Sequence, residues 1–478
     1  MFMCPHFTVI ATAFAVLLID LFLQERQRWL LGTVTAGGLV LAFLAAVMTP
    51  IHGGAMFGGR FEANAVTWWF NIIFILAALV TVIISMDMVN GNAKVRVRGM
   101  GARGEYFAVM LFTLTGMMYF AAARDLVTFY VSLELATIPM FALASWRRED
   151  AKSGEAGLKY VILAMISSSL MLYGLALIYG LSGTSSLTHL ALAKQSPLLW
   201  FAVALVLAGA GAKFTVAPFH FWAADVYEGA PTPITAYLSV ASKCTGLVFM
   251  FQFMFVFFSE WLSNMGFLFA SIAAITMTIG NTVAIVQTNI KRFMAFSSIS
   301  QAGYFLMGFL SPQAPAVPAL LYYMLIYLVS NMGVFTAIIW YANETGREDI
   351  DEYHGLSRTN PLMALMMMVC LFSLAGIPPL SGFVGKFFLF SIASSAGYHW
   401  LVAVAAVNST ISLYYYLRVV RQMYIEPVYP DAQFIPVPKK MVWTEGFLFA
   451  AVLLLGIVPT LYEHIHADTV GWFAALPK

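Results

Sequence analysis

Runs of apolar residues long enough to cross a membrane follow one another along almost the whole chain. A helix needs about 20 consecutive apolar residues to span the hydrocarbon core of a bilayer. About fourteen segments meet this requirement, so we predict an all-α polytopic membrane protein. The predicted spans are residues 6–23, 29–48, 66–86, 105–123, 126–145, 156–180, 199–220, 231–257, 267–288, 293–310, 316–342, 361–393, 399–420 and 441–462.

The composition supports this fold class. The chain is 61% hydrophobic and only 10% charged, with a mean hydropathy of +0.83, whereas a soluble domain averages about 25% charged residues. The net charge of +2 does not indicate a nucleic-acid partner, because the charges are divided between loops and helix interiors. The N-terminal run lacks the basic region and the cleavage site of a signal peptide, so we expect a retained first helix.

Lysine and arginine are distributed unevenly between the two sets of connections. With the N-terminus outside, about 16 basic residues fall in cytoplasmic connections and about 4 in outer ones. We therefore predict a multi-pass protein of the bacterial cytoplasmic (inner) membrane with both termini on the outer, periplasmic side. Five basic residues lie within predicted helices: Lys159, Lys213, Lys243, Lys386 and Arg418.

The segment 206–246 carries two of these lysines at membrane depth. Lys213 lies near the middle of an apolar, Gly/Ala-rich helix, and Pro218 interrupts the same run five residues later because proline lacks the N–H that continues a helix. Lys243 lies in the middle of the next apolar helix. A cation in the hydrocarbon region is costly and needs a partner or water. These lysines are therefore candidate functional residues.

A second interrupted run resembles the first. Gly376, Pro378 and Pro379 break the run 361–393, and Lys386 follows the break. The two broken runs are the seventh and the twelfth, and an offset of five helices inverts one unit relative to the other. Broken helices at matching places in two halves indicate a transport site. We predict helices 1–3 in residues 1–104, two inverted five-helix repeats (helices 4–8 and 9–13) in 105–257 and 267–421, and helix 14 with the tail in 441–478.

Glu134 is a candidate acidic residue within a predicted helix. It lies about eight residues into the fifth predicted helix. Desolvation disfavours the charged form of each group, and pairing opposes that effect. Forming or breaking a contact between a glutamate and a lysine would therefore make the lysine hold or release a proton. The alternative is a structural ion pair that fixes helix packing.

Three further residues are weaker candidates for proton transfer. Lys159 lies about one turn into helix six and is as well explained by a side chain that reaches the cytoplasmic face. His220 follows the seventh-helix break and titrates near neutral pH, although a capping role is as plausible. Gln301, in a run of hydroxyl-bearing residues, would support a chain of waters.

The sequence offers no ligands for a redox cofactor or a metal. Cys4, Cys244 and Cys370 are isolated from one another, which indicates neither an iron–sulfur cluster nor a zinc site. The eight histidines are scattered, and no two share a span at haem-ligand spacing. We expect any redox chemistry to occur in other chains.

Three segments carry a resemblance to a known family: KFTVAPFHFWAADVYEGAPTPITAYLSVASK, IKRFMAFSSISQAGY and FSLAGIPPLSGFVGKFFLF. They resemble the antiporter-like membrane subunits of respiratory complex I, and the resemblance covers almost the whole chain. YEGAPTP followed by SVASK, and a lysine in the twelfth helix, are similar to type N rather than to types L and M. The long lateral helix that marks type L does not follow helix fourteen.

The resemblance implies a fourteen-helix fold with two inverted repeats and a role in proton translocation. It implies that Glu134 pairs with Lys213, that Lys243 occupies a central hydrophilic axis, and that Lys386 leads toward the outer face. Many relatives carry histidine where this chain has Gln301, and an amide cannot take up a proton near neutral pH.

The family implies partners and cofactors that this chain does not itself contain. The expected partners are antiporter-like M and L types, small K, J and A types, the lipid bilayer and protons. NADH, FMN, iron–sulfur clusters and quinone are expected to bind elsewhere in the complex. The alternatives are a subunit of a multi-subunit cation/proton antiporter, the membrane arm of a hydrogenase or another non-NADH dehydrogenase, and a structural spacer whose lysines only pack the assembly.

Overall fold

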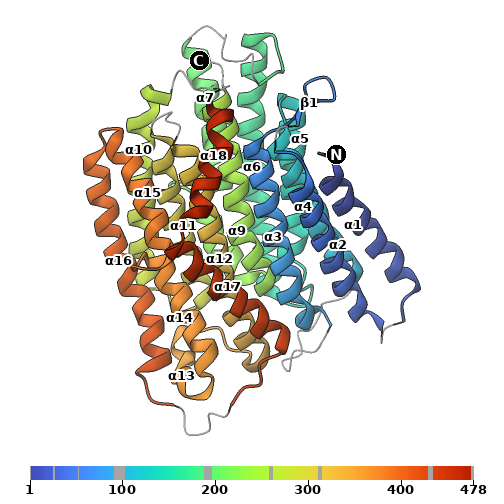
Figure 1. The fold of residues 1–478 in the computed structure, drawn as a ribbon, viewed down its shortest axis with the longest axis vertical. Helices are drawn as coiled ribbons and strands as arrows, with labels where there is room; N and C mark the ends of the chain where they lie inside the picture. Colours follow the sequence, from blue (N-terminus) through green and yellow to red (C-terminus); the bar gives the residue numbers. More distant parts are fainter. Residues whose placement is uncertain are drawn as a thin grey trace.

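Long helices run side by side between two faces of the molecule in a computed structural model that describes residues 2–24, 27–51, 53–90, 103–187, 196–257, 262–310, 315–428 and 434–474 (Figure 1). The hairpin face carries the start of α1 (Cys4–Phe22), the antiparallel strands β1 (Gly54–Met56) and β2 (Phe61–Ala63), and the end of α18 (Thr460–Ala474). The opposite face carries the short helix α13 (Leu356–Thr359).

The helices confirm the predicted all-α membrane fold. Twelve of them within the described ranges are long and apolar enough to cross a membrane. The N-terminal group continues with α2 (Trp29–Met48) and α3 (Ala65–Val89). The next group comprises α4 (Arg103–Ala122), α5 (Leu126–Ala144), α6 (Ala151–Ser182), α7 (Pro197–Phe214), α8 (Phe221–Gly229) and α9 (Thr232–Met250), which continues as a π-helix, η3 (Phe251–Phe257).

The second half of the chain repeats this plan. It comprises α10 (Leu262–Ile285), α11 (Ile290–Leu306) with the 3-10 turn η5 (Met307–Phe309), α12 (Ala316–Thr345), the 3-10 turn η6 (Ile350–Tyr353), α14 (Pro361–Ala375), α15 (Ser381–Ser395), α16 (His399–Tyr424) and α17 (Lys439–Ile457). Helix α7 covers most of the seventh predicted run, 199–220, and ends at the predicted break; α8 begins just after that run. Helices α14 and α15 are the two halves of the twelfth predicted run. The division of the chain at residues 104, 257 and 421 stays a prediction.

The two breaks place backbone carbonyls in the protein interior. Thr215, directly after α7, adopts a left-handed conformation with φ 57°. Gly376, directly after α14, has φ 90°, a conformation that side chains other than glycine rarely adopt. The last carbonyls of a helix lack partners within that helix. Each break therefore presents hydrogen-bond acceptors to neighbouring side chains.

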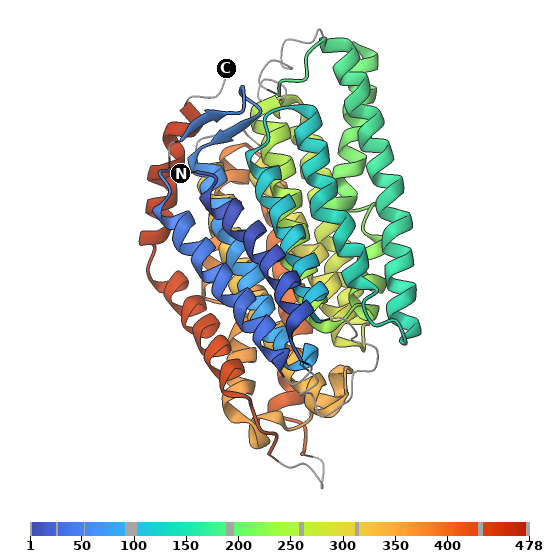
Figure 2. The same cartoon turned by 90° about the vertical axis from the view of Figure 1, so that its right-hand side faces the viewer.

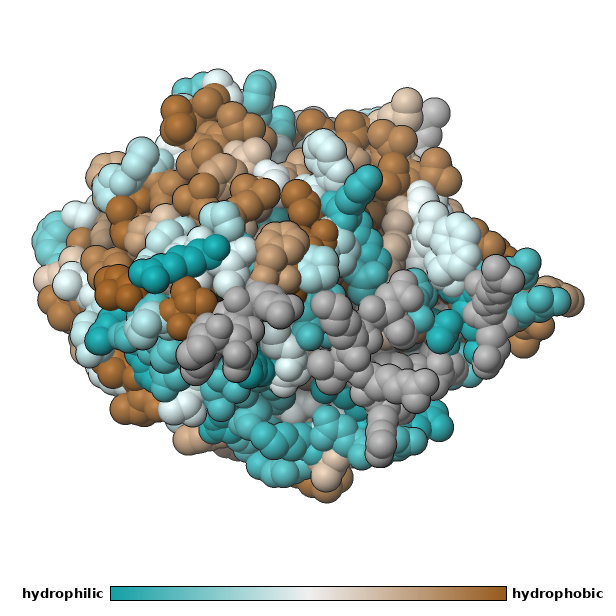
Figure 3. All heavy atoms as spheres, turned by 90° about the horizontal axis from the view of Figure 1, so that it is seen from below, coloured by the Kyte–Doolittle hydropathy of each residue, from teal (hydrophilic) through white to brown (hydrophobic). Residues whose placement is uncertain are grey.

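Helices α9 and α12 form the centre of the bundle. Residues 316–341 of α12 are buried without exception, and α9 is buried over nearly its whole length. Outer helices such as α6 and α16 instead expose large apolar side chains, as expected for a surface that faces lipid. Figure 3 shows hydrophilic residues gathered on the opposite face, among apolar ones.

The last predicted run, 441–462, is interrupted, and the membrane-spanning helix α17 ends at Ile457. After α17 the chain breaks at Val458, which is extended because proline follows it, and then continues as α18 (Figure 2). Helix α18 contains Glu463 and Asp468, so its sequence did not read as membrane-spanning. Trp69 Nε1 of α3 donates a hydrogen bond to Asp468 Oδ2 at 3.1 Å, which ties α18 to the N-terminal helices.

Part of the predicted charge asymmetry lies outside the described residues. These positions are Arg26, the basic residues of 91–102, Lys194 and Lys478. The described basic residues of the opposite face include Lys152, Lys291 and Arg292, which contact acidic partners there.

Candidate functional site

The structure brings Lys213 and Glu134 together between α7 and α5. Lys213 Nζ lies 4.0 Å from Glu134 Oε1 and 3.4 Å from the hydroxyl of Thr137, one turn along α5. Ser168 of α6 donates a hydrogen bond to the same carboxylate oxygen at 2.7 Å. Lys213 lies in the last turn of α7, where the negative end of the helix dipole favours a cation. The ion pair is long, so the lysine is only loosely held.

A small cavity lies beside Lys213. Its volume is about 30 Å³ and its lining is mostly apolar, with Thr137, Ser167, Ser242 and Thr245 among the lining residues. A cavity needs at least about 10–15 Å³ and polar partners to hold a water molecule. The space is large enough for one water, whose polar partners would be Lys213 and these hydroxyl-bearing residues.

Lys243 of α9 points at the break that follows α7. Its side chain is fully buried, and Nζ donates a hydrogen bond to the hydroxyl of Thr215. That hydroxyl in turn donates to the carbonyl of Phe214 at 2.7 Å. Thr215 stands only two residues after Lys213. The break therefore links two of the predicted lysines through one short stretch of chain.

Lys386 of α15 is held by the end of α14. Nζ donates to the carbonyls of Leu374 at 3.0 Å and Ala375 at 2.9 Å, and to the hydroxyl of Ser409 at 3.2 Å. It also lies 4.5 Å from the centre of the Tyr304 ring, within the range of a cation–π contact. The described contacts of Lys386 are thus with neutral groups.

Gln301 of α11 shares an acceptor with Lys386. Its amide donates to the carbonyl of Leu374 at 3.2 Å, and the hydroxyl of Tyr323 donates to its side-chain oxygen. The structure therefore places Gln301 beside the predicted exit lysine. The amide fixes hydrogen-bond partners there and does not itself titrate.

A cluster of hydroxyls occupies the centre between Lys243 and Gln301. Tyr327 of α12 donates to the hydroxyl of Ser298 at 3.0 Å and to the carbonyl of Ser239 at 3.2 Å. The amide of Asn331 donates to the Ser239 hydroxyl. Ser239 lies one turn before Lys243 on α9. Polar groups from α9, α11 and α12 therefore join the two halves of the chain.

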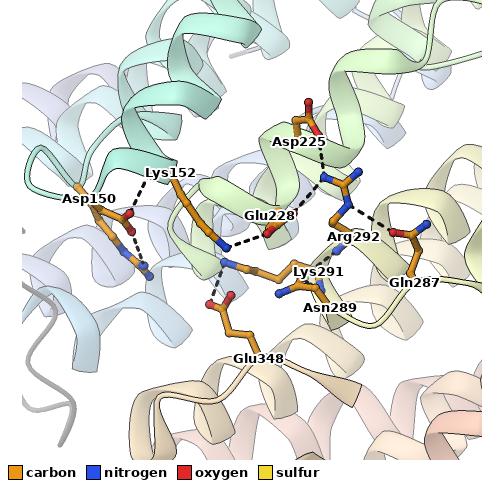
Figure 4. A network of polar contacts seen from close by, with 10 residues as sticks. Asp150, Lys152, Asp225, Glu228, Gln287, Asn289, Lys291, Arg292 and Glu348 are labelled. Carbon is orange, nitrogen blue, oxygen red and sulfur yellow. Dashed lines mark hydrogen bonds and ion pairs between the residues drawn. The ribbon is translucent and has the colours of Figure 1, made fainter. Parts of the chain in front are cut away.

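Lys159 is separate from these buried groups. It belongs to an ion-pair cluster at the opposite face, the face that carries α13. Its Nζ lies 2.6 Å from Asp225 and 2.7 Å from Glu155. Arg292 lies 2.7 Å from Asp225 and 3.0 Å from Glu228, which also contacts Lys152 at 3.0 Å (Figure 4). The hydrogen bond from Lys159, together with Arg292, holds the pKa of Asp225 below its usual range. The cluster surrounds a cavity of about 110 Å³.

The role of this cluster was not predicted. The acidic turn Asp225–Glu228 is visible between two prolines in the sequence, and Arg292 contributed only to the charge asymmetry. Their assembly depends on α6, α8 and α11 meeting at one face, which no local pattern indicates.

His220 lies at the start of α8, next to the break. It is largely buried, and its ring lies against Phe221 with the ring centres 4.6 Å apart. Within the described part of the chain, its Nδ1 has no hydrogen-bond partner. The structure does not place it in direct contact with Lys213, Lys243 or Lys386.

Comparisons with known proteins agree on one family. A family described as "NADH:quinone oxidoreductase/Mrp antiporter, TM" matches residues 123–412. NADH-quinone oxidoreductase subunit N of Moorella thermoacetica is 41% identical over 420 residues, covering 87% of this chain and 86% of that protein. The subunit N of Trichlorobacter lovleyi is 38% identical over 465 residues, covering 96% and 94%.

Solved structures share the fold over nearly the full length. A chain of respiratory complex I from Thermus thermophilus matches with a TM-score of 0.80 and 30% identity, covering 96% of this chain and 98% of that one. A chain of the Mrp complex from Dietzia matches with a TM-score of 0.86 at 22% identity, covering 98% and 97%, which shows the fold alone. The chain therefore belongs to the antiporter-like membrane subunits of NADH:quinone oxidoreductase, in their subunit N branch.

Proposed function

We propose that this chain moves protons across the membrane through Glu134, Lys213, Lys243 and Lys386, driven by quinone reduction in other subunits. In this account the chain has no redox centre of its own. NADH, FMN, iron–sulfur clusters and quinone bind elsewhere in the complex and supply the free energy.

The observation that carries the proposal is the placement of three buried lysines at the two helix breaks. Lys213 lies in the last turn before the first break, and Lys243 donates to the residue that forms it. Lys386 donates to the last carbonyls before the second break. Neutral acceptors hold a protonated lysine less firmly than a close carboxylate does. Each lysine can therefore release its proton without breaking a tight ion pair.

Proton transfer would begin at the opposite face. The cavity among Lys159, Asp225 and Arg292 gives water access to the inner ends of α6, α8 and α11. Water in the cavity beside Lys213 would then exchange protons with its ammonium group. Separation of Lys213 from Glu134 removes the carboxylate that favours the charged lysine. The proton then leaves Lys213 Nζ and binds Lys243 Nζ.

The second half of the path leads from Lys243 to Lys386. The hydroxyls of Ser239, Ser298 and Tyr327 can each accept one proton and donate another. Gln301 shares the carbonyl of Leu374 with Lys386 as a hydrogen-bond acceptor. Because the Gln301 amide takes up no proton, its role would be to hold water beside this carbonyl. Each proton crosses against about 2.3 kcal/mol per 100 mV of membrane potential.

The membrane location and the partners follow from the same proposal. The chain would cross the bacterial inner membrane with both termini on the periplasmic side, so that the opposite face is cytoplasmic. Its neighbours would be the M and L types and the small K, J and A types of the membrane arm. The subunit N relatives favour this reading over an antiporter or a hydrogenase membrane arm.

The test replaces Lys243 by methionine, which keeps the volume and removes the titratable group. In membranes with verified subunit content, we expect proton uptake and quinone reduction to fall together. Lys439→Met, at the start of α17 and outside the core, is the matched control and should leave both rates unchanged. Unchanged rates in Lys243→Met would refute the proposal.

A further inference from the structure

A buried carboxyl group that the proposed pathway does not use lies in α17. Glu445 is 0% exposed, and neither of its carboxyl oxygens has a hydrogen-bond partner within the described ranges. Burying a charged carboxylate without a partner is expensive. The nearby cation on the same helix, Lys440, is already paired with Asp87 of α3 at 2.6 Å. Glu445 therefore needs another explanation.

The surroundings of Glu445 come from two other helices. It faces Gly333 and Thr336 of α12 and Cys370 of α14. A Cβ at position 333 would lie 2.4 Å from Cys370 Sγ, so only glycine lets α12 and α14 approach this closely at the carboxyl group. The hydroxyl of Thr336 donates to the carbonyl of Met332 at 2.8 Å.

A chain of hydroxyls begins one helical turn from this carboxyl group. Ser330 lies three residues before Gly333, and Ser373 lies three residues after Cys370. Their hydroxyls are 2.8 Å apart, and Ser373 is 3.1 Å from the hydroxyl of Ser381 on α15. One turn is about 5.4 Å along a helix axis, so the carboxyl group and the serines need a hydrogen-bonded water between them to exchange a proton.

The other end of this chain reaches Lys386. Ser373 immediately precedes Leu374, whose carbonyl accepts a hydrogen bond from Lys386 Nζ at 3.0 Å. Cys370 and Leu374 are separated by about 6 Å along α14, given the rise of about 1.5 Å per residue. The serines therefore lie between the buried lysine and the buried carboxyl group.

We propose that Glu445 is a proton-holding carboxyl group on a side branch of the pathway that ends at Lys386, an inference that rests on the proposed function. In this step the N–H bond of the Lys386 ammonium breaks, and protons shift through bridging water and the hydroxyls of Ser373 and Ser330, each of which accepts one proton and donates another. An O–H bond then forms on Glu445. The product is a neutral amine and a neutral carboxylic acid, which avoids keeping two separated charges in the apolar interior.

The first experiment compares Glu445→Gln with the wild type in assembled complexes. The amide keeps the size of the side chain and cannot carry the proton. We expect at least a threefold loss of proton uptake and quinone reduction. Infrared difference spectra between resting and turning-over complexes should also lose a carboxylic C=O band. Wild-type rates together with an unchanged spectrum would overturn the proposal.

The second experiment removes one hydroxyl from the chain of serines. It also tests the branch if complexes with Glu445→Gln do not assemble. Ser373→Ala should slow both rates, whereas Ser85→Ala, a buried serine of α3 that donates to Val82 at 2.9 Å, should not. Equal rates in the two serine variants would refute the branch.

Lys386→Met, measured in parallel, distinguishes a failure of the Glu445 branch from a failure of the proposed proton pathway. If Lys386→Met slows turnover and neither Glu445→Gln nor Ser373→Ala does, only the branch is wrong. If Lys386→Met also matches the wild type, the proposed function itself fails.

Discussion

Lys243 Nζ donates a hydrogen bond to the hydroxyl of Thr215, the left-handed residue directly after α7. Because Thr215 stands two residues after Lys213, this contact joins the two lysines of the first repeat. A change in the conformation of the break would therefore move both.

Thr215→Val tests this contact. Valine keeps the shape and the β-branch but removes the acceptor, leaving a buried donor whose desolvation costs about 1–3 kcal/mol. We expect slower proton uptake and quinone reduction, with recovery in Thr215→Ser. Thr81→Val on α3, whose hydroxyl donates to its own helix, controls for a buried Thr-to-Val change. Wild-type rates in Thr215→Val would show that the hydroxyl is dispensable.

Replacing Lys213 by alanine should impair pumping and turnover together. Glu134, which is half-buried, would then lose its partner. Breaking a fully buried pair costs about 3–5 kcal/mol, which is an upper limit here, so assembly is verified first. Lys213→Arg should not restore activity, because a guanidinium group keeps its proton at all accessible pH values. Normal proton pumping in well-assembled Lys213→Ala membranes would be incompatible with the assignment.

The cluster at the opposite face predicts a pH-dependent contribution to stability. Because the pKa of Asp225 is below its usual range in the folded chain, its contribution is present above the unfolded pKa of about 3.9 and is lost as pH falls through the folded value. The group is partly exposed, so we expect Asp225→Asn to cost at most about 1 kcal/mol at pH 7. Thermal unfolding at pH 7 and pH 3 should show a difference that shrinks in acid. A difference that grows in acid would contradict this sign.

The topology gives a separate prediction. A reporter fused after Lys478 should lie outside the membrane, and a reporter in the loop 343–360 should lie inside. The physical basis is the excess of lysine and arginine in cytoplasmic connections. If the reporter after Lys478 is labelled from the inside and the reporter in the loop 343–360 from the outside, the predicted orientation is wrong.

The sequence was sufficient for the membrane fold and both breaks, because apolar length and proline chemistry are local signals. The pairing of Glu134 with Lys213 was expected from the family resemblance rather than from such a local signal. It was not sufficient for the partners of Lys386, since Ser409 is 23 residues away and only the packing of α15 on α16 brings it close. The helix α18 was not predicted because its acidic residues and histidines do not form an apolar run, although it packs against α3 and α12. Glu445 attracted no attention in the sequence because it lies near a predicted helix end.

The most direct test of the proposed pathway is the rate of proton uptake and quinone reduction in membranes carrying Lys386→Met. Methionine keeps the volume and removes a buried charge, so the complex should assemble. We predict that both rates fall, while Lys439→Met retains wild-type rates. If Lys386→Met matches the wild type in both measurements, Lys386 only packs the second break and protons leave by another route.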